Sequence, residues 1–389
     1  MNELEFIAQN KNKSLPEIAL QLSKTDLDKE FILAQINGIQ KAKNKLPEFY
    51  NTPNIVYPSK LSMEQCSSEK TGVYKSSIIR HSGLDPEFHL IDLTGGFGID
   101  CFYFSKTFKK VTHIEQNATL SKIAKNNFKL LKANTIETIN STAEEFIKTT
   151  SLKADIVYID PSRRNENQRV FKLDECVPNI IDLAPEIFKI TNHILVKTAP
   201  LLDIKQSIKD LKFVSKIWVI SVDNDCKEVL YLLEKDFSSL PEINTVNLSK
   251  INQEYSFNYT KEAEAFANYT QAKSYLYETN ASILKAGAFN SICNQFDVDK
   301  IAPNSHLYTS ENLIENFPGR TFKIETTIPY STKDFKKLGI KKANVSCRNF
   351  KDSVEQTKKK LKLKDGGKHY IFATTDNNNK PILIICVKS

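Results

Sequence analysis

The segment that most constrains the fold is a glycine-rich run directly after an apolar stretch. The residues LIDL (90–93) are followed by TGGFG (94–98). Glycine adopts positive φ angles readily and lets a ligand approach the backbone, and a helix that begins after such a turn directs its free N–H groups at the ligand. Gly95, Gly96 and Gly98 miss the G-x-G-x-x-G spacing, which disfavours a dinucleotide. The run predicts a strand, a nucleotide-cofactor turn and a helix.

Two further apolar segments lead into polar residues that can serve the same ligand. VTHI (111–114) is followed by Glu115, 23 residues after Asp92, and a carboxylate at this point can accept both ribose hydroxyls of an adenosine. ADIVYI (154–159) leads into a polar loop that begins at Asp160. Ligands bind at the carboxyl ends of the strands in an open α/β sheet, so these three strand ends predict one site.

The pattern along the chain predicts helices first and an α/β core second. Residues 1 to about 80 read as helices, as in KEFILAQI (29–36), and one helix should begin near Ser67 or Ser68. From 88 to about 235, strands alternate with helices, which is typical of a parallel sheet with crossover helices. The predicted strands are 90–93, 111–114, 155–159, 193–197 and 217–222, with helices at 118–131 and 201–211.

The last part of the chain predicts a different organisation. After about residue 240 we expect Asn- and Tyr-rich loops and a helix-like run over 261–286. Residues 320–389 combine strand-like runs with a lysine-rich helix over 354–363, which fits a small α+β module. The strand-like runs are 322–325, 370–373 and 382–385.

The three strand ends resemble the motifs of class I S-adenosylmethionine-dependent methyltransferases. These motifs are a D-x-x-x-G-x-G turn, an acid that closes the second strand and an N/D-P-P-(Y/F/W) loop after the fourth. The resemblance implies a Rossmann-like α/β core with S-adenosylmethionine as the cofactor. It implies that the cofactor-binding residues are Gln65, Ser67, Asp92, Thr94, Gly95, Gly96, Gly98, Glu115, Gln116 and Thr142, and that the catalytic residues are Asp160, Pro161, Ser162 and Arg163.

Both ends of the chain extend the resemblance to a narrower group. LSMEQCSSE (61–69), RNF (348–350) and DGG (365–367) resemble a bacterial group of RNA methyltransferases that carry a THUMP-like C-terminal domain. The resemblance implies that the partner is RNA, either tRNA or rRNA. It also implies four domains: an N-terminal helical segment (1–80), a Rossmann-like cofactor-binding domain (81–240), a ferredoxin-like linker domain (241–320) and a basic THUMP-like domain (321–389).

Positive charge is concentrated near the C-terminus. Between Ser331 and Tyr370, 13 Lys and Arg stand against 4 Asp and Glu, a net charge of +9, whereas the whole chain carries +8. Such an excess is expected of a module that docks a phosphate backbone, although a solvated lysine face on a helix explains the same residues. Arg348 and Phe350 can stack on bases, and Phe350 equally suits a core.

The loop after residue 159 carries the predicted chemistry. In the amino-methyltransferases that this loop resembles, the acid and the first proline carbonyl accept hydrogen bonds from an exocyclic NH₂ group, so Asp160 and Pro161 favour a base amine. Ser162 and Arg163 stand where those enzymes have a second proline and an aromatic residue. Arg163 or Arg164 can replace the lost stacking platform, or the two can clamp a phosphate.

Several candidate residues have a purely structural alternative. Gln65, Ser67 and Ser68 can flank the methionine end of the cofactor, or a serine can simply cap a helix. Asp92 can hold the methionine amino group or brace the turn, and Glu115 can be an exposed acid at a helix start. Thr142 or Asn140 can contact the adenine amine, whereas a capping box explains Ser141 and competes for Thr142. Lys197 can face either substrate or solvent.

Composition sets the remaining expectations. The chain has 389 residues and 7 scattered cysteines without a C-x-x-C pair, which predicts reduced thiols and no metal site. It has neither a spanning apolar stretch nor the apolar core of a signal peptide, so we expect a cytoplasmic protein that does not enter a membrane. The sequence therefore predicts an RNA methyltransferase that acts on a base nitrogen. The alternatives are a protein or small-molecule methyltransferase, or a non-catalytic RNA-binding or assembly factor that retains the cofactor fold.

Overall fold

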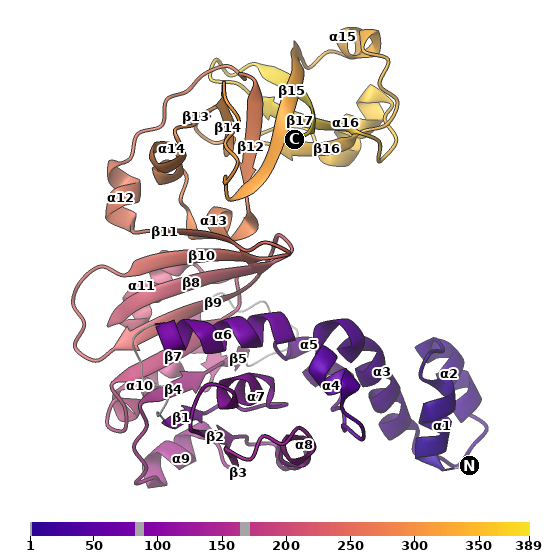
Figure 1. Ribbon diagram of the computed structural model, residues 1–389, viewed down its shortest axis with the longest axis vertical. Helices are drawn as coiled ribbons and strands as arrows, with labels where there is room; N and C mark the ends of the chain where they lie inside the picture. Colours follow the sequence, from indigo (N-terminus) through magenta and orange to yellow (C-terminus); the bar gives the residue numbers. More distant parts are fainter. Residues whose placement is uncertain (1, 82–88, 164–171) are drawn as a thin grey trace. The chain divides into compact units, whose positions relative to one another are not determined.

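The computed structural model of the protein describes residues 2–81, 89–163 and 172–389 (Figure 1). The chain forms two compact units. The first contains Met1–Ser215 and Val229–Ser239, and the second contains Lys216–Glu228 and Leu240–Ser389. The division therefore falls inside the strands β8 (Val214–Val222) and β9 (Asp225–Glu234).

The first unit begins with the predicted helices. Phe6, Ile18 and Ile36 are buried together with neighbouring apolar residues, so the first three helices share one small core. Asn2 and Glu5 form a capping box at the first helix, and Asp28 caps the third. These helices are α1 (Glu3–Asn10), α2 (Leu15–Leu22), α3 (Lys29–Lys45), α4 (Pro47–Asn51), α5 (Lys60–Gln65) and α6 (Glu69–His81).

The predicted alternation of strands and helices is confirmed in the rest of the first unit. The strands are β1 (His89–Asp92), β2 (Lys110–Ile114), β3 (Ile136–Ile139), β4 (Ile156–Ile159) and β7 (His193–Thr198), with β5 (Ser162–Arg163) and β6 (Cys176–Val177) in a separate ribbon. The helices are α7 (Ile99–Ser105), α8 (Ala118–Leu130), α9 (Ala143–Thr149), α10 (Ile180–Ile187) and α11 (Ile204–Leu211), with a short 3₁₀ turn, η1 (Leu173–Glu175).

The sheet of the first unit has the order β9-β7-β4-β1-β2-β3. The strands β7, β4, β1, β2 and β3 are parallel, whereas β9 is antiparallel to β7. All residues of β4 are buried, as expected of a parallel strand covered on both faces. The register pairs Asp92 with Tyr158 and Ile159 with Val196. This alignment brings the carboxyl ends of β1, β4 and β7 to one edge.

The second unit contains strands of its own and a complete second sheet. One group has the order β11 (Gln253–Phe257), β10 (Glu242–Leu248), β8, and the second sheet has the order β13-β14-β12-β15-β18-β17-β16. These strands are β12 (Tyr275–Thr279), β13 (Asp299–Lys300), β14 (Leu307–Ser310), β15 (Gly319–Pro329), β16 (Asn344–Arg348), β17 (His369–Thr375) and β18 (Pro381–Lys388). The helices are α12 (Tyr259–Glu264), α13 (Ala281–Ala286), α14 (Ser291–Phe296), α15 (Thr332–Lys337) and α16 (Val354–Leu361).

Two expectations for the second unit differ from the structure. Residues 261–286 do not form one helix: α12 ends at Glu264, β12 follows, and α13 begins after Asn280, whose side chain caps it. The alternating aromatics Tyr275 and Tyr277 favour a strand, and here they outweigh the helix-like run. The expected loops after residue 240 also contain β10 and β11. The strand-like runs and the lysine-rich helix of residues 320–389 are confirmed.

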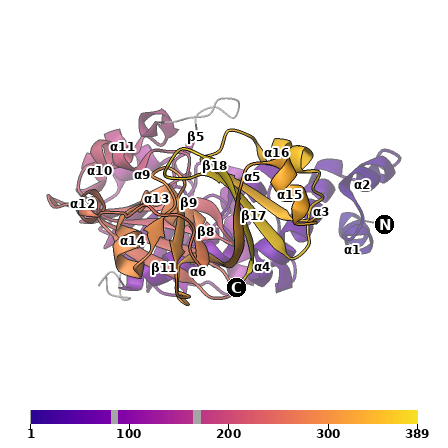
Figure 2. The same cartoon turned by 90° about the horizontal axis from the view of Figure 1, so that it is seen from above.

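Figures 1 and 2 show α15 and α16 side by side next to the strands of the second sheet. Phe335 and Leu361 from these two helices pack with Ile371 and Ile385 of the sheet in one buried cluster. On the opposite face, Phe322 and neighbouring apolar residues form a second cluster. In the part of the chain that the structure describes, no helix is both long and apolar enough to cross a bilayer.

Candidate active site

The glycine turn between β1 and α7 is packed tightly at two positions and open at one. A Cβ on Gly95 would come within 2.3 Å of the His113 ring, and one on Gly98 within 2.4 Å of Phe128. Gly98 caps α7 with a φ of 85°, a conformation that favours glycine. Gly96 also has a positive φ, but the nearest atom to its Cβ position is the Thr94 carbonyl oxygen at 3.8 Å. A ligand can therefore approach the backbone at Gly96.

Glu115 holds the open part of this turn. Its Oε2 accepts a hydrogen bond from the Gly96 N–H at 2.8 Å, and its Oε1 accepts one from the Asn117 N–H at 2.7 Å. The Asn140 side chain donates to the carbonyl oxygens of Glu115 and Gln116 at 2.7 and 3.0 Å. The carboxylate is only partly buried, so it combines a structural role with an accessible surface.

The buried side chain of Asp92 stabilises the same turn. Its side chain is buried, Oδ1 accepts the Thr94 N–H at 2.9 Å, and Oδ2 accepts the Cys101 thiol at 3.1 Å. Burial raises the pKa of Asp92 to about 7, and the nearby carboxylates of Asp100 and Asp160 act in the same direction. This geometry favours the bracing role for Asp92.

Asp160 is fixed at the end of β4 through both its backbone and its side chain. The Asp160 N–H donates to Thr94 Oγ1 at 2.7 Å, which connects the acidic loop to the glycine turn. Its carboxylate forms an ion pair with Lys197 of β7. The Asp160 side chain is 34% exposed and that of Lys197 only 12%, so the carboxylate is the more accessible partner.

Lys197, which the sequence left open between substrate and solvent, is the partner of Asp160. It lies one residue before the end of β7, directly after the apolar run 194–196. The strands β4 and β7 are neighbours in parallel register, with Ile159 opposite Val196. Residues 160 and 197 are therefore adjacent at the sheet edge. The available signal was a lone lysine near the carboxyl end of a buried strand, but only the register identifies its partner.

The Asp160 loop continues into the short β5–β6 ribbon. Ser162 Oγ donates to the Val177 carbonyl at 3.3 Å, and the backbone of Arg163 pairs with Cys176. The Arg163 side chain and Arg164 lie outside the described residues, so base stacking and phosphate clamping by these arginines stay sequence predictions.

A buried charge network lies beside the turn. Lys75 Nζ is 3.0 Å from Asp100 Oδ1 and donates to Ser67 Oγ at 2.8 Å. Ser67 and Tyr158 both donate to Asp100 Oδ2, at 2.9 and 2.8 Å. Burial opposes ionisation of Asp100, but the positive charges of Lys75 and Lys197 and these hydrogen bonds hold its pKa below the usual value. The Ser67 hydroxyl therefore serves this network.

The other pre-core and strand-three candidates have separate positions. Ser68 accepts the Thr71 N–H at 3.2 Å, which confirms a helix start near Ser67 or Ser68. Thr142, and not Ser141, caps α9, because its Oγ1 accepts the Glu145 N–H at 3.1 Å. The preferred capping role for Ser141 is therefore wrong. Gln65 is exposed at the end of α5.

Hydrogen bonds within the described ranges join five of the predicted residues in two sets that meet in the glycine turn. Thr94 connects Asp92 to Asp160, and Glu115 holds Gly96, whereas the side chains of Gln65 and Thr142 belong to neither set. Those ranges contain no group of three or more His, Cys, Asp and Glu side chains that could hold a metal ion. The arrangement can hold a nucleotide-containing ligand at Gly96 and Glu115 and present the Asp160 carboxylate beside it.

A carboxylate of β12 pairs with two arginines of the second unit. Glu278 is buried and forms ion pairs with Arg320 and, at 2.7 Å, with Arg348. Phe350 packs edge-on against Tyr330 with ring centroids 4.8 Å apart and joins the cluster below α15 and α16. Phe350 is therefore partly buried against this core, and Arg348 is held by an ion pair.

Comparisons with known proteins agree with this architecture. The crystal structure of a "putative methyltransferase" from Porphyromonas gingivalis W83 is 30% identical in sequence, with a TM-score of 0.87 over 100% of this chain and 99% of that chain. Family models match residues 78–188 (conserved hypothetical protein 95), 275–318 (ferredoxin-like domain) and 319–388 (THUMP domain-like). No curated protein matches the sequence.

Two further solved structures are more distant. An rRNA methylase from Streptococcus thermophilus is 14% identical, with a TM-score of 0.32 over 42% of this chain and 96% of that chain. A tRNA m1G37 methyltransferase from M. jannaschii is 16% identical, with a TM-score of 0.31 over 44% of this chain and 51% of that chain. At these scores the likeness carries no argument about the present chain.

Proposed function

The chain belongs to the methyltransferase family that the Porphyromonas gingivalis protein represents, and we propose that it transfers the methyl group of S-adenosylmethionine to a base nitrogen of RNA. The observation that carries this proposal is the hydrogen bond from the Asp160 N–H to Thr94 Oγ1 at 2.7 Å. It fastens a partly exposed carboxylate to the cofactor turn. An acceptor group bound by that carboxylate would lie next to the cofactor.

The residues of the turn fit S-adenosylmethionine. Gly96 has a positive φ and open space above its backbone. The Glu115 carboxylate uses one lone pair of each oxygen on a backbone N–H, which leaves acceptor capacity for the ribose hydroxyls. When bound, S-adenosylmethionine supplies an electrophilic methyl group. Gly95 and Gly98 keep the turn tight against β2 and α8.

The acidic loop fits an amine acceptor. A carboxylate only accepts hydrogen bonds, so Asp160 can orient a base N–H and draw its proton towards the oxygen as the nitrogen attacks. The ion pair with Lys197 fixes the direction of the Asp160 carboxylate. The Pro161 carbonyl can accept the second N–H of an exocyclic amine. Methyl transfer needs little more than this alignment, since positioning can contribute several orders of magnitude in rate.

The second unit supports RNA as the substrate. Its THUMP-like part covers residues 319–388, and the segment from Ser331 to Tyr370 carries 13 basic against 4 acidic residues. A cationic surface of this kind favours a polyanion and gives an affinity that falls steeply with salt. The proposal therefore assigns positioning of the acceptor to the first unit and docking of the RNA to the second.

The test begins with nucleosides. Mass spectrometry of tRNA and rRNA from a strain without the gene should show the loss of one methylated nucleoside. Purified protein and S-adenosylmethionine should restore it in the isolated RNA, whereas Asp160→Ala should not. Asp225→Ala, which removes an exposed carboxylate of the second unit (71% exposed), serves as the matched control and should behave as wild type.

The decisive contrary result is an unchanged set of RNA nucleosides while the protein is expressed and binds S-adenosylhomocysteine in calorimetry. That combination would point to a protein or small-molecule acceptor. Full cellular function of Asp160→Ala would instead support a binding factor without catalysis.

A further inference from the structure

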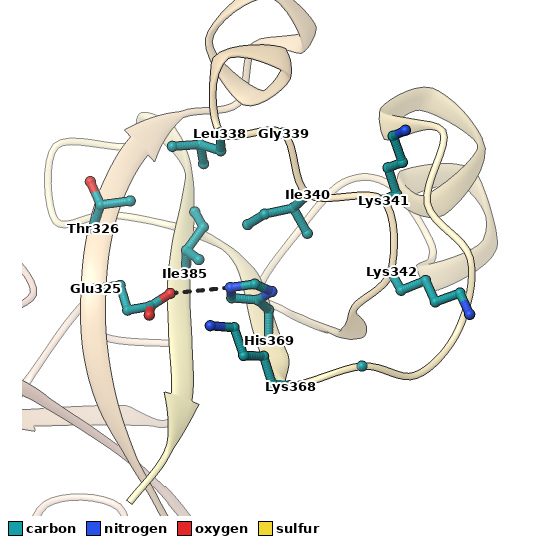
Figure 3. A pocket seen from close by; sticks show the side chains of 11 residues that line it. Glu325, Thr326, Leu338, Gly339, Ile340, Lys341, Lys342, Lys368, His369 and Ile385 are labelled. Carbon is teal, nitrogen blue, oxygen red and sulfur yellow. Dashed lines mark ion pairs between the residues drawn. The ribbon is translucent and has the colours of Figure 1, made fainter.

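The second unit contains a cavity of about 570 Å³ that the proposed methyl transfer does not use. Figure 3 shows it between β15, the loop after α15 and the start of β17. Leu338, Ile340 and Ile385 supply apolar surface, and Glu325, Lys368 and His369 supply the polar groups that point into it. The volume lies in the range typical of small-molecule sites.

A bulge in β15 creates one wall of this cavity. The register of β15 against β18 pairs Ile324 with Cys386 but Thr326 with Ile385, so Glu325 is the extra residue. Bulges bend a strand and redirect a side chain, and they are common next to functional sites. Here the bulge places Glu325 beside His369, with Glu325 Oε2 at 3.5 Å from His369 Nε2.

The opposite wall is built by backbone hydrogen bonds. The Lys364 N–H donates to the Lys341 carbonyl and the Ala343 N–H donates to the Lys364 carbonyl, both at 3.0 Å. The Asn344 side chain donates to the Gly367 carbonyl at 3.2 Å. These bonds hold the Leu338–Lys342 loop and the DGG turn (365–367) in place, so the cavity has fixed walls on both sides.

The groups inside the cavity match the edge of a nucleobase. The Glu325 side chain is 41% exposed and that of His369 only 20%, so the carboxylate is the more accessible of the two groups. A carboxylate accepts adjacent N–H groups, and a lysine or imidazole N–H donates to a carbonyl. Guanine has adjacent N1–H and N2–H groups and a neighbouring O6 on one edge. The apolar surface of Leu338 and Ile340 suits the face of the ring.

We propose that this cavity binds the base of one unpaired guanine nucleotide, with Glu325 accepting its N–H groups and Lys368 or His369 donating to its carbonyl. The inference rests on the proposed RNA substrate and adds a base-reading site to the docking module. Lys341 and Lys342 point away from the cavity in Figure 3. They stand on the outer rim, where the flanking phosphates of a bound strand would pass.

A titration of the full-length protein tests the inference without methyl transfer. The chain has 6 histidines, so the ring signals of selectively ¹³C-labelled histidine can be resolved by NMR and that of His369 assigned from His369→Gln. GMP should shift the His369 signal saturably, and AMP and inorganic phosphate should do so with clearly weaker affinity. Glu325→Gln should weaken GMP binding by about tenfold, because one bidentate contact to a base is lost. Glu355→Gln, an exposed glutamate of the same module, should leave it unchanged.

Equal shifts with GMP and AMP, or equal GMP affinity in Glu325→Gln and wild type, would overturn the inference. A response to inorganic phosphate equal to that of GMP would also overturn it and identify an anion site. The result is separable from the proposed function. If Glu325→Gln loses GMP affinity while no RNA is methylated, only the proposed function fails. If RNA is methylated and GMP affinity is insensitive to Glu325, only this inference fails.

Discussion

The two units each pair a carboxylate with cations, but they expose opposite partners. In the first unit, Asp160 is 34% exposed and its partner Lys197 only 12%. In the second, Glu278 is only 3% exposed, whereas Arg320 and Arg348 are 42% and 38% exposed. The buried partner fixes the geometry, and the exposed partner remains available to a ligand. The first unit therefore presents a hydrogen-bond acceptor and the second presents guanidinium donors.

This difference separates the two tasks of an enzyme that modifies a polyanion. An exposed carboxylate suits an N–H group at the reaction centre, and it repels phosphates. Guanidinium groups suit phosphates because their planar fork donates several hydrogen bonds. If the comparison is correct, removing the exposed Asp160 should cost activity. Removing the exposed arginines should cost more stability than removing Glu278, because it leaves a buried charge without a cation.

The largest effect is expected from Asp160→Ala. Its carboxylate is the exposed partner, and loss of a positioned acid–base group typically lowers the rate by 10²–10⁴-fold. The bond to Thr94 involves the backbone N–H of residue 160, so the cofactor turn should persist. Single-turnover methyl transfer and calorimetry with S-adenosylhomocysteine measure the two properties. More than about a tenth of the wild-type rate would break the comparison.

The second effect concerns stability in the second unit. Replacing both Arg320 and Arg348 by Met leaves the Glu278 carboxylate buried without a cation, at a cost of about 3–5 kcal/mol in the free energy of unfolding. Glu278→Gln leaves two cations that already reach solvent, so its cost should be about 1–2 kcal/mol. Urea unfolding followed by circular dichroism measures both. Equal losses of unfolding free energy in the double Met variant and in Glu278→Gln would contradict the assignment of Glu278 as the buried partner.

The third effect comes from Asp92, a buried carboxylate that is held by Thr94 and Cys101. Its folded pKa of about 7 lies above the exposed value of about 4, so the folded state retains the proton that the unfolded chain loses. The free energy of unfolding should fall as pH rises from about 4 to about 7 and level off above. The difference in the free energy of unfolding between Asp92→Asn and wild type should shift by about 2–3 kcal/mol in favour of the variant as pH rises from 5 to 8. A pH-independent difference between the two proteins would disprove this.

The smallest effect is expected from Lys197. Lys197→Met should lower kcat by about tenfold, since Asp160 stays in place but loses its fixed direction and charge partner. The free energy of unfolding should fall less than in the double arginine variant, because Asp160 can be solvated and Lys75 still pairs with the buried Asp100. Lys197→Arg should recover most of the rate. A rise in KM with unchanged kcat in Lys197→Met would contradict a positioning role.

The sequence was most informative where local pattern and function coincide. The strand before Asp92, the glycine turn and the helix start near Ser68 follow from local propensities, so their positions could be predicted. Lys197 could not, because its partner lies 37 positions away in the chain and only strand register joins them. The helix-like run over 261–286 failed for a related reason, since β12 is stabilised by its neighbours β14 and β15.

The buried network of Lys75, Asp100, Ser67 and Tyr158 bears on how far the chain can be divided. Lys75 lies on α6, and its side chain is wholly buried against Asp100 at the start of α7. A fragment that begins at residue 81 would keep Asp100 but lose Lys75, its ion-pair partner, and the Ser67 hydroxyl. Helix α6 is thus an integral part of the α/β core. If α6 is exchanged between related proteins, Lys75 and Asp100 must be exchanged together.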